Sequence, residues 1–417
     1  MEKSVIFVPH QDDEINLVGN ILMDLVKKYD TYIVYSSLEV NLELAKIRKS
    51  EAINACRIYG IAEDKIIFLG YPDTPNRNGH HFFTDGNKKI VQDIQNILLD
   101  LRPKLIIGTD FDFHSDHRML ALALDDAIKN VMVKNKEYTP KYLKGFCYET
   151  AYYGLDDYSA SSLKETKVKS NLLSNVSYRW DDRISIKNNE QNGFIFSKVQ
   201  FKALKCHKSQ YAAIHARSII NSDNVFWEKR LDNLLIRDAI VTSSSGNVKK
   251  INDLKVIDTD DILTENPYKI DYSKSLWIPD EADNHPIINV DFTENKAVNQ
   301  IVFHGNPNNS FLEKCNIEIH CNDQIYYLNF LNPYGQATVV NIEKVNCSKI
   351  EICFFNKVFI SEIEVFQTID SIQQLQTINF KDKKNSFIDQ LDNFFFSIYV
   401  FLEKIRRKMN LLRRNIR

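Results

Sequence analysis

The sequence is short of several features that would point to a particular class of protein. Its 53 Lys and Arg residues nearly balance 55 Asp and Glu residues, so the net charge of −2 provides no global attraction to nucleic acid. Its apolar runs all fall short of the roughly eighteen residues that a transmembrane helix needs. The seven cysteines include no Cys-x-x-Cys pair, and an expected strand follows Met1 so closely that no cleaved leader fits. We therefore expect a cytoplasmic protein with reduced thiols.

The composition indicates a globular chain of more than one domain. At 417 residues the chain exceeds one ordinary domain, and a hydrophobic content of 44% with 26% charge is sufficient for a sizeable core. Strand-like and helix-like periods alternate through the first half of the sequence, with strands expected near residues 31–35, 65–69, 105–108 and 145–148. Such a series predicts a parallel α/β sheet covered by helices on both faces.

Two clusters of His and acidic residues stand where expected strands end. Residues 10–14 read His-Gln-Asp-Asp-Glu after the apolar run at residues 4–8, and residues 114–117 read His-Ser-Asp-His after the run at 105–108. The carboxyl ends of parallel strands share one edge of a sheet, so the two clusters are expected to converge there. Together they supply two imidazoles and a carboxylate for a divalent metal, and a carboxylate and an imidazole for proton transfer. This is the composition of a catalytic zinc site with an open position.

Each cluster has a simpler interpretation when it is considered alone. Asp12 or Asp13 could accept the free N–H groups at a helix N-terminus, and His114 with His117 could belong to a solvated helix start. The occurrence of both clusters at expected strand ends favours the metal site.

The two motifs resemble those of the PIG-L/LmbE-like family of zinc-dependent N-acetylglucosaminyl deacetylases. The family's first motif reads Ala/Pro-His-Pro-Asp-Asp-Glu and its second reads His-Pro-Asp-His. The resemblance implies that His10, Asp13 and His117 bind Zn²⁺. It also implies that Asp12 is the general base and that His114 assists the carbonyl oxygen or the leaving group.

Further matches follow in the family's order and extend the resemblance over about residues 1–235. Residues 48–51 resemble its Arg-x-x-Glu helix and residues 70–73 its Gly-x-x-Asp strand end, which implies that Arg48 and Asp73 bind substrate. Residues 207–210 resemble its His-x-Ser-Gln segment, on a helix expected over 198–217. There His207 either lines the site or has a hydrogen-bonded structural role, and we favour the structural role. Gln11 and Ser115 replace the usual prolines, and neither is an expected ligand.

From about residue 240 helical periods give way to short alternating runs, which predict an antiparallel sandwich. Their order resembles a discoidin-like, galactose-binding-type jelly roll, with Asp260, Asp261 and Trp277 in its opening region. Such a module either binds sugar or braces its neighbour. The polar segment 151–197 is expected to be irregular, either as a substrate-shaping insertion or as an ordinary surface excursion.

The last fifty residues predict an amphipathic helix that begins with a capping box at Ser386 and Asp389. An aromatic-rich apolar stripe extends from Phe387 to Ile405, and residues 404–417 contain seven Lys or Arg and no acid. This pattern favours an anionic membrane surface, which for a cytoplasmic protein is the inner face of the membrane; the alternative is packing on the catalytic domain or on a second subunit.

We therefore predict three parts: a Rossmann-like deacetylase domain over residues 1–238, a discoidin-like β-sandwich over 239–368, and a basic amphipathic tail over 369–417. The predicted activity is zinc-dependent removal of an N-acetyl group from a hexosamine-containing glycan, lipid-linked sugar or nucleotide sugar. The alternatives are a sugar- or nucleotide-binding protein without catalysis, because fold alone does not decide function, and a deacylase of another small amide or acylated thiol conjugate.

Overall fold

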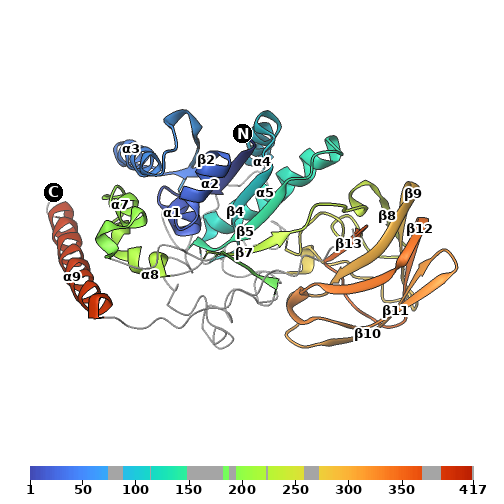
Figure 1. Cartoon of the computed structure of the whole chain (residues 1–417). Helices are drawn as coiled ribbons and strands as arrows, with labels where there is room; N and C mark the ends of the chain where they lie inside the picture. Colours follow the sequence, from blue (N-terminus) through green and yellow to red (C-terminus); the bar gives the residue numbers. More distant parts are fainter. Residues whose placement is uncertain are drawn as a thin grey trace.

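The computed structural model has an α/β region with an antiparallel β-sandwich on one side and a long C-terminal helix on the other (Figure 1). The structure describes residues 1–73, 88–112, 114–147, 182–186, 194–221, 224–257, 272–368 and 387–415. Residues 151–181, the pair Asp260 and Asp261, and Ser386 of the expected capping box lie outside the described residues.

The first sheet has seven strands in the order β3-β2-β1-β4-β5-β7-β6. The strands are β1 (Lys3–Val8), β2 (Asp30–Leu38), β3 (Ile66–Pro72), β4 (Leu105–Thr109), β5 (Lys141–Gly145), β6 (Ile184–Ile186) and β7 (Asn224–Lys229). The five strands from β3 to β5 are parallel, whereas β7 and β6 extend the sheet antiparallel. The predicted mostly parallel α/β sheet is confirmed.

Both faces of this sheet are buried because successive residues of its strands point to opposite faces and are apolar on both. On β1, Val5 and Phe7 join one core cluster, and Ile6 and Val8 join the other. The first face is covered by α4 (Lys88–Leu101) and α5 (Ser115–Lys134). The second face is covered by α1 (Asp13–Val18), α2 (Leu22–Lys28), α3 (Leu42–Ile58), α7 (Val199–Leu204) and α8 (Ala216–Asn221).

The second sheet has six strands, and all its pairings are antiparallel. They are β8 (Ile240–Ser243), β9 (Ile287–His304), β10 (Glu313–Cys321), β11 (Gln324–Leu331), β12 (Thr338–Phe354) and β13 (Glu362–Phe366). Residues 287–304, within the region where short alternating runs were expected, form one long strand, β9. Trp277 is fully buried, and its indole N–H donates to the carbonyl oxygen of Ser245. The predicted β-sandwich after the α/β sheet is confirmed.

The α/β part and the sandwich share one buried cluster that continues from α5 through Trp227 and Leu234 to the inner residues of β9. The Nζ atom of Lys229 on β7 lies 2.7 Å from a carboxylate oxygen of Glu364 on β13, and both side chains are largely buried. Removing one partner of such a pair costs about 3–5 kcal/mol, because the other charge is left buried and unpaired. This contact therefore helps to hold the sandwich against the edge of the first sheet.

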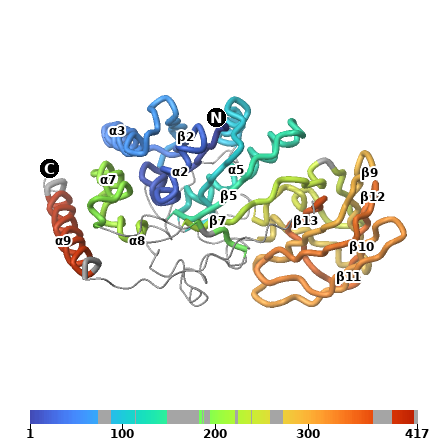
Figure 2. The backbone as a smooth tube through the Cα atoms, viewed as in Figure 1, coloured from blue at the N-terminus to red at the C-terminus, as the bar shows by residue number. Residues whose placement is uncertain are grey.

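The C-terminal helix α9 (Phe387–Asn415) lies beside α7 and α8, far from the sandwich (Figure 2). Among the described residues, none of the helices combines the length and the apolar character that crossing a membrane requires. Short 3-10 helices complete the described elements: η1 (Glu63–Lys65), η5 (Ile195–Ser197), η6 (Ala212–His215), η7 (Ile236–Asp238), η9 (Tyr272–Lys274) and η10 (Pro333–Gly335).

Three local predictions are wrong. The strand expected at residues 145–148 is instead β5, which ends at Gly145 and carries the buried Lys144. The helix expected over 198–217 is broken into α7, η6 and α8: α7 ends at Leu204, and Tyr211, directly before η6, has the left-handed conformation with φ 58°. Within the segment expected to be irregular, residues 184–186 form the edge strand β6.

Candidate metal centre

The two His/Asp clusters meet where the strand order reverses between β1 and β4. These neighbouring parallel strands pair from Ser4 with Leu105 to Phe7 with Gly108, so their carboxyl ends lie at the same edge. Strands β2 and β3 continue the sheet on one side of this point, and β5 continues it on the other. A crevice outside the carboxyl ends at such a reversal is the usual ligand position in open α/β sheets.

Three donor atoms of the predicted ligands form a nearly regular triangle. The Nδ1 atom of His10 lies 3.0 Å from an Oδ atom of Asp13, and the Nε2 atom of His117 lies 3.2 Å from the same oxygen. The two imidazole nitrogens are 3.3 Å apart. Tetrahedral zinc ligands at about 2.0–2.1 Å from the ion lie about 3.3–3.4 Å from one another. The residues present therefore fit a tetrahedral cation with one open position.

The second ring nitrogen of each imidazole faces a carboxylate. The Nε2 atom of His10 lies 3.0 Å from Asp116 and 3.2 Å from Asp73, and the Nδ1 atom of His117 lies 2.5 Å from Asp112. Such contacts fix the ring orientation and make the opposite nitrogen a better metal ligand. The sequence interpretation assigned no role to Asp112 or Asp116. Asp116 lies within the second motif, and Asp112 lies shortly after strand β4. Their positions beside the predicted ligands could have indicated that they contact the imidazoles.

The electrostatics of the cluster favour positive charge. Burial lowers the pKa of His117, but Asp112 and Asp13 outweigh burial and raise the pKa to about 10. Burial also lowers the pKa of His10, and Asp73, Asp116 and Asp13 raise it well above its usual value. Burial raises the pKa of Asp13, yet His117 and His10 hold it well below the usual range. A site that stabilises protonated imidazoles in this way also suits a divalent cation.

Four other side chains lie within ligand distance of members of this cluster, and two of them, Asp73 and Asp116, form a second possible ligand group with His10 and His114. His114 groups with His10 and His117, and Cys147 groups with Asp13 and His117. The Cys147 thiol donates to the Thr109 hydroxyl, and burial raises its pKa well above the usual range, so it is held as a neutral thiol. The neutral thiol is therefore a poorer ligand than the triangle of His10, Asp13 and His117, whose spacing fits tetrahedral coordination.

Asp12 occupies the N-cap position of α1, but its side chain makes no capping hydrogen bond. Its backbone has φ 139°, a conformation that costs a residue other than glycine about 1–3 kcal/mol. Burial and the neighbouring Asp13 carboxylate raise the pKa of Asp12 to about 7. The helix-cap interpretation therefore does not account for Asp12, and a carboxyl group with this pKa suits a general base.

His114 stands at the N-cap of α5, and its ring does accept a hydrogen bond at the helix start. The backbone N–H of Asp116 donates to Nδ1 of His114 over 3.2 Å. Burial, followed by the charges of His10 and His117, lowers the pKa of His114 to about 4. The ring is therefore neutral near pH 7 with its proton on Nε2, and that N–H group is suited to donate to an oxyanion.

Arg48 and Asp73, predicted to bind substrate, contact each other at the same edge. The Nη1 atom of Arg48 donates to Asp73 over 3.1 Å and to Glu39 over 3.3 Å, and its Nη2 atom donates to Gln210. Asp73 also contacts His10, so this network braces the metal centre. Both side chains remain partly exposed, at 12% and 17%, and their role in substrate binding stays a prediction.

His207 has the structural role that the sequence interpretation favoured. Its Nε2 atom lies 2.9 Å from a carboxylate oxygen of Glu14, and both side chains are fully buried. Ser209, two positions later, donates to both carboxylate oxygens of Glu51. These contacts attach the segment after α7 to the first motif and to α3.

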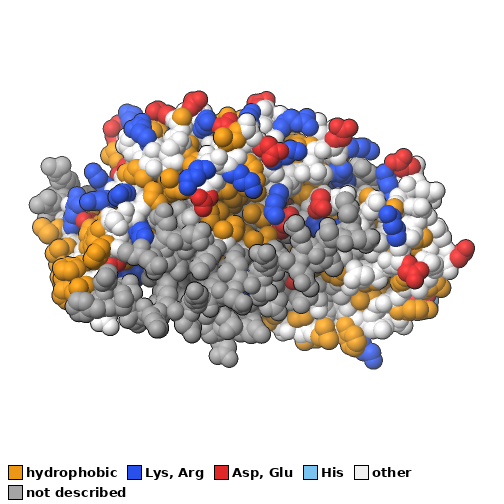
Figure 3. All heavy atoms as spheres, in the orientation of Figure 1, with side chains coloured by type: hydrophobic (Ala, Val, Ile, Leu, Met, Phe, Trp, Pro, Cys, Tyr) orange, Lys and Arg blue, Asp and Glu red, His pale blue; other side chains and the backbone are white. Residues whose placement is uncertain are grey.

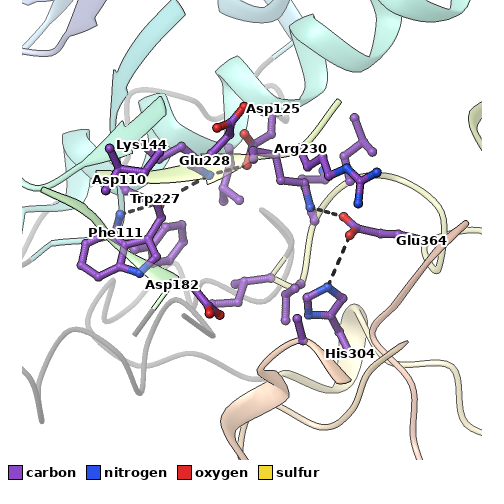
Figure 4. A pocket seen from close by; sticks show the side chains of 18 of the residues that line it. Asp110, Phe111, Asp125, Lys144, Asp182, Trp227, Glu228, Arg230, His304 and Glu364 are labelled. Carbon is purple, nitrogen blue, oxygen red and sulfur yellow. Dashed lines mark hydrogen bonds and ion pairs between the residues drawn. The ribbon is translucent and has the colours of Figure 1, made fainter. Parts of the chain in front are cut away.

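A separate cavity of about 400 Å³ lies between the α/β part and the sandwich (Figure 4). Its labelled residues include Lys144 and Asp125 from the α/β part and His304 and Glu364 from the sandwich. None of the seven predicted site residues is among its described lining residues, so the metal centre and this cavity are distinct features.

Comparison with known proteins agrees with the sequence motifs. Residues 5–128 match the family model PIG-L, described as GlcNAc-PI de-N-acetylase, which confirms the resemblance stated from the two motifs. Among curated proteins, none matches the chain.

Solved structures resemble the two parts of the chain separately. The N,N'-diacetylchitobiose deacetylase from Pyrococcus horikoshii is 21% identical with a TM-score of 0.26, over 33% of this chain and 52% of that protein. This chain therefore matches only about half the length of that enzyme. The family 32 carbohydrate-binding module of NanJ from Clostridium perfringens, solved with galactose, is 14% identical with a TM-score of 0.23, over 32% of this chain and 98% of that module. These likenesses concern the fold alone.

Proposed function

We propose that this chain, which carries a PIG-L domain at its N-terminus, is a zinc-dependent deacetylase of a hexosamine-containing glycoconjugate. The observation that supports this most directly is the triangle of His10, Asp13 and His117 at the edge that also carries Asp12 and His114. A binding protein without chemistry has no need for a base and an oxyanion donor beside a metal centre. The presence of both therefore favours catalysis over simple binding.

The proposed ligands would hold the cation with two nitrogen atoms and one carboxylate oxygen, which is a common donor set for catalytic zinc. A zinc ion there would lower the pKa of a water molecule and polarise the acetyl carbonyl. Asp112 and Asp116 keep the two imidazoles oriented through their second ring nitrogens. The remaining chemistry depends on Asp12 and His114.

Asp12 removes a proton from the attacking water as the new C–O bond forms. Its pKa of about 7 places it near the value at which a carboxylate is both present and basic enough at neutral pH. The same group then returns the proton to the amide nitrogen as the C–N bond breaks. The proton left on the nascent acetic acid then passes to the amine, so the products are acetate and the protonated amine of the sugar, and protons balance without another acid.

His114 stabilises the negative charge that develops on the acetyl oxygen. Because its Nδ1 atom accepts from the Asp116 backbone, Nε2 carries the proton and donates it in a hydrogen bond. A donor of this kind strengthens its contact as the oxygen gains charge, and its removal from a hydrolase typically lowers kcat about 10²–10³-fold.

The test is an acetate-release screen with the zinc-loaded full chain. The panel contains N-acetylated monosaccharides, oligosaccharides, nucleotide sugars and lipid-linked sugars, and each reaction is also assayed for free amine. The control is the double variant His10→Ala/His117→Ala. Equal release of acetate and amine by the wild type alone supports the proposal. Saturable sugar binding without acetate release would favour the binding-protein alternative, and release from non-sugar amides alone would favour the other deacylases.

A further inference from the structure

The C-terminal helix α9 has one face packed on the α/β part of the chain. The Asp392 carboxylate accepts a hydrogen bond from the backbone N–H of Ile195 at about 3.1 Å, and Phe396 is only 3% exposed. The Tyr399 ring lies 5.5 Å from that of Phe201 in an edge contact. The packing of this face agrees with the alternative given by the sequence, in which the helix packs on the catalytic domain.

A second face of the same helix is apolar and exposed. Nine side chains on it are 37–62% exposed: Leu391, Phe394, Phe395, Ile398, Phe401, Leu402, Ile405, Met409 and Leu412. At 3.6 residues per turn they fall within about 120° of the helix circumference, roughly opposite Asp392 and Phe396. Figure 3 shows the hydrophobic side chains gathered over α9 at the left edge of the molecule. A continuous apolar patch of this kind on a protein surface indicates a binding partner.

Basic side chains border the apolar face on both sides. The helical spacing places Lys404 and Lys408 along one border and Arg406 along the other, and all three are exposed. Residues 404–417 contain seven Lys or Arg and no acidic residue. Long basic side chains at the borders of an aromatic face are positioned to reach lipid headgroups while the aromatic rings enter the boundary below them.

We propose that α9 binds the surface of an anionic lipid bilayer through this face and thereby attaches the whole chain to it. The charges favour a bilayer over a second copy of the chain. In a parallel pair of α9 helices, the two basic segments would lie together and repel each other. In an antiparallel pair, the basic segment would face residues 387–393, but the helical spacing places both acids there, Asp389 and Asp392, on the docked side of the helix and away from the apolar face. Anionic headgroups complement the basic borders directly.

The docked face of α9 also contacts Tyr211, which is next in sequence to a residue that touches the first motif. The Asn410 side chain donates to the Tyr211 hydroxyl over 2.8 Å, and the Arg407 guanidinium lies over the Tyr211 ring. The preceding residue, Gln210, donates to the backbone carbonyl of Gln11 in the first motif. The helix on the bilayer is thus connected through two side-chain contacts to the edge that holds the metal ligands. The proposal does not depend on which substrate that edge accepts.

The test is co-sedimentation of the full chain with vesicles of phosphatidylcholine, with and without phosphatidylserine. Binding to the anionic vesicles alone, weakening as ionic strength rises, is expected because salt screens the attraction. The variant Phe394→Gln/Phe395→Gln/Phe401→Gln should bind at least ten-fold more weakly. The matched control is Phe311→Gln/Phe330→Gln/Phe355→Gln, which removes three exposed rings from the sandwich and should bind as the wild type does.

The basic borders are tested in the same way. Lys404→Gln/Lys408→Gln should weaken binding about five-fold for each charge removed, whereas Lys349→Gln/Lys357→Gln on the sandwich should change nothing. Zinc content and circular dichroism show that each variant is folded. Absence of wild-type binding to anionic vesicles at low salt would overturn the proposal. The wild-type 48.6 kDa chain could instead form a dimer that the substitution of the three Phe residues of α9 converts to a monomer. If vesicle binding were unchanged in that variant, the apolar face would be assigned to a second copy of the chain.

Discussion

The Nε2 atom of His117 lies 3.3 Å from the Nδ1 atom of His10, although 107 positions separate these residues in the chain. The register of the sheet brings them together, since Phe7 on β1 pairs with Gly108 on β4. Each imidazole follows shortly after its strand, so the distance between them depends on buried backbone pairing rather than on a long loop. The centre is therefore held in place before any ion binds, which reduces the ordering needed on binding.

We expect the purified protein to carry about one zinc per chain, because three ligands and an open position match a catalytic site. Either His10→Ala or Asp13→Ala should abolish zinc retention through a desalting column, measured by elemental analysis. His285→Ala, at an exposed position on the sandwich, serves as the control. Full zinc occupancy in a His10→Ala/His117→Ala double variant would show that the ligands have been assigned wrongly.

Asp12→Asn should retain zinc and lose about 10²–10⁴-fold in turnover, because the amide cannot accept the proton of the water. Asn has nearly the size and shape of Asp, so the fold should be preserved. Acetate release and zinc content are measured on the same sample. Turnover within a few-fold of the wild type would assign the base to another group.

His114→Ala should also keep its zinc, and its loss should appear in kcat more than in KM. The reason is that the Nε2–H donor gains strength only as the acetyl oxygen becomes charged. His114→Gln, whose amide can also donate, should recover part of the rate. If His114→Ala raises KM and leaves kcat unchanged, His114 contacts the substrate equally strongly in the ground state and in the transition state.

Asp112→Asn should weaken zinc affinity by about 10–100-fold while leaving the three ligands in place. The carboxylate contacts His117 at Nδ1 over 2.5 Å, and an amide orients and polarises the ring less strongly. Competition with a chromophoric chelator measures the affinity, and the exposed Asp24→Asn on α2 is the control. Equal affinities for the wild type and Asp112→Asn would mean that this contact has no influence on the ligand.

The parallel sheet and the convergence of the two His/Asp clusters could be predicted because their signals are local, whereas the choice of His10, Asp13 and His117 as ligands followed from the family resemblance. Apolar runs mark β1 and β4 as buried strands, and each motif stands directly after its strand, so the sheet edge brings them together. The position of β5 could not be predicted in this way. Lys144 is buried in that strand because Asp125 and Asp110 lie 2.8 Å and 3.4 Å from its Nζ atom. Those partners come from α5 and from the end of β4, and no local pattern reveals them.

The interruption of the helix after Leu204 and the docking of α9 could not be predicted for the same reason, because both depend on contacts with residues distant in the chain. The sequence between 198 and 217 has a helical period, but hydrogen bonds from Ser209 to Glu51 and from Gln210 to Gln11 hold the chain in a turn. The apolar stripe of α9 was evident in the sequence. That Asp392 and Phe396 would dock on the opposite side depends on η5 and α7, which are distant in the chain.

Because of His215 on η6, the stability of the chain should decrease as the pH falls below about 6.5. Burial, followed by the charges of Arg407 and Lys404 on α9, lowers its pKa from 6.5 to about 4. Above pH 6.5 the imidazole is neutral in both the folded and the unfolded chain, so it has no effect on stability. Between pH 6.5 and 4 the unfolded chain binds a proton that the folded chain does not, so stability decreases as the pH falls.

His215→Gln removes this titration. We expect the decrease in Tm between pH 7 and pH 5 to be smaller in the variant than in the wild type, by roughly 2 °C. Differential scanning calorimetry at both pH values provides the measurement, and His285→Gln, at an exposed position, should keep the wild-type dependence. Other buried histidines titrate in all three proteins, so only the difference between variants is informative. If Tm decreases equally in His215→Gln and in the wild type, burial and the charges of Arg407 and Lys404 do not lower the pKa of this imidazole.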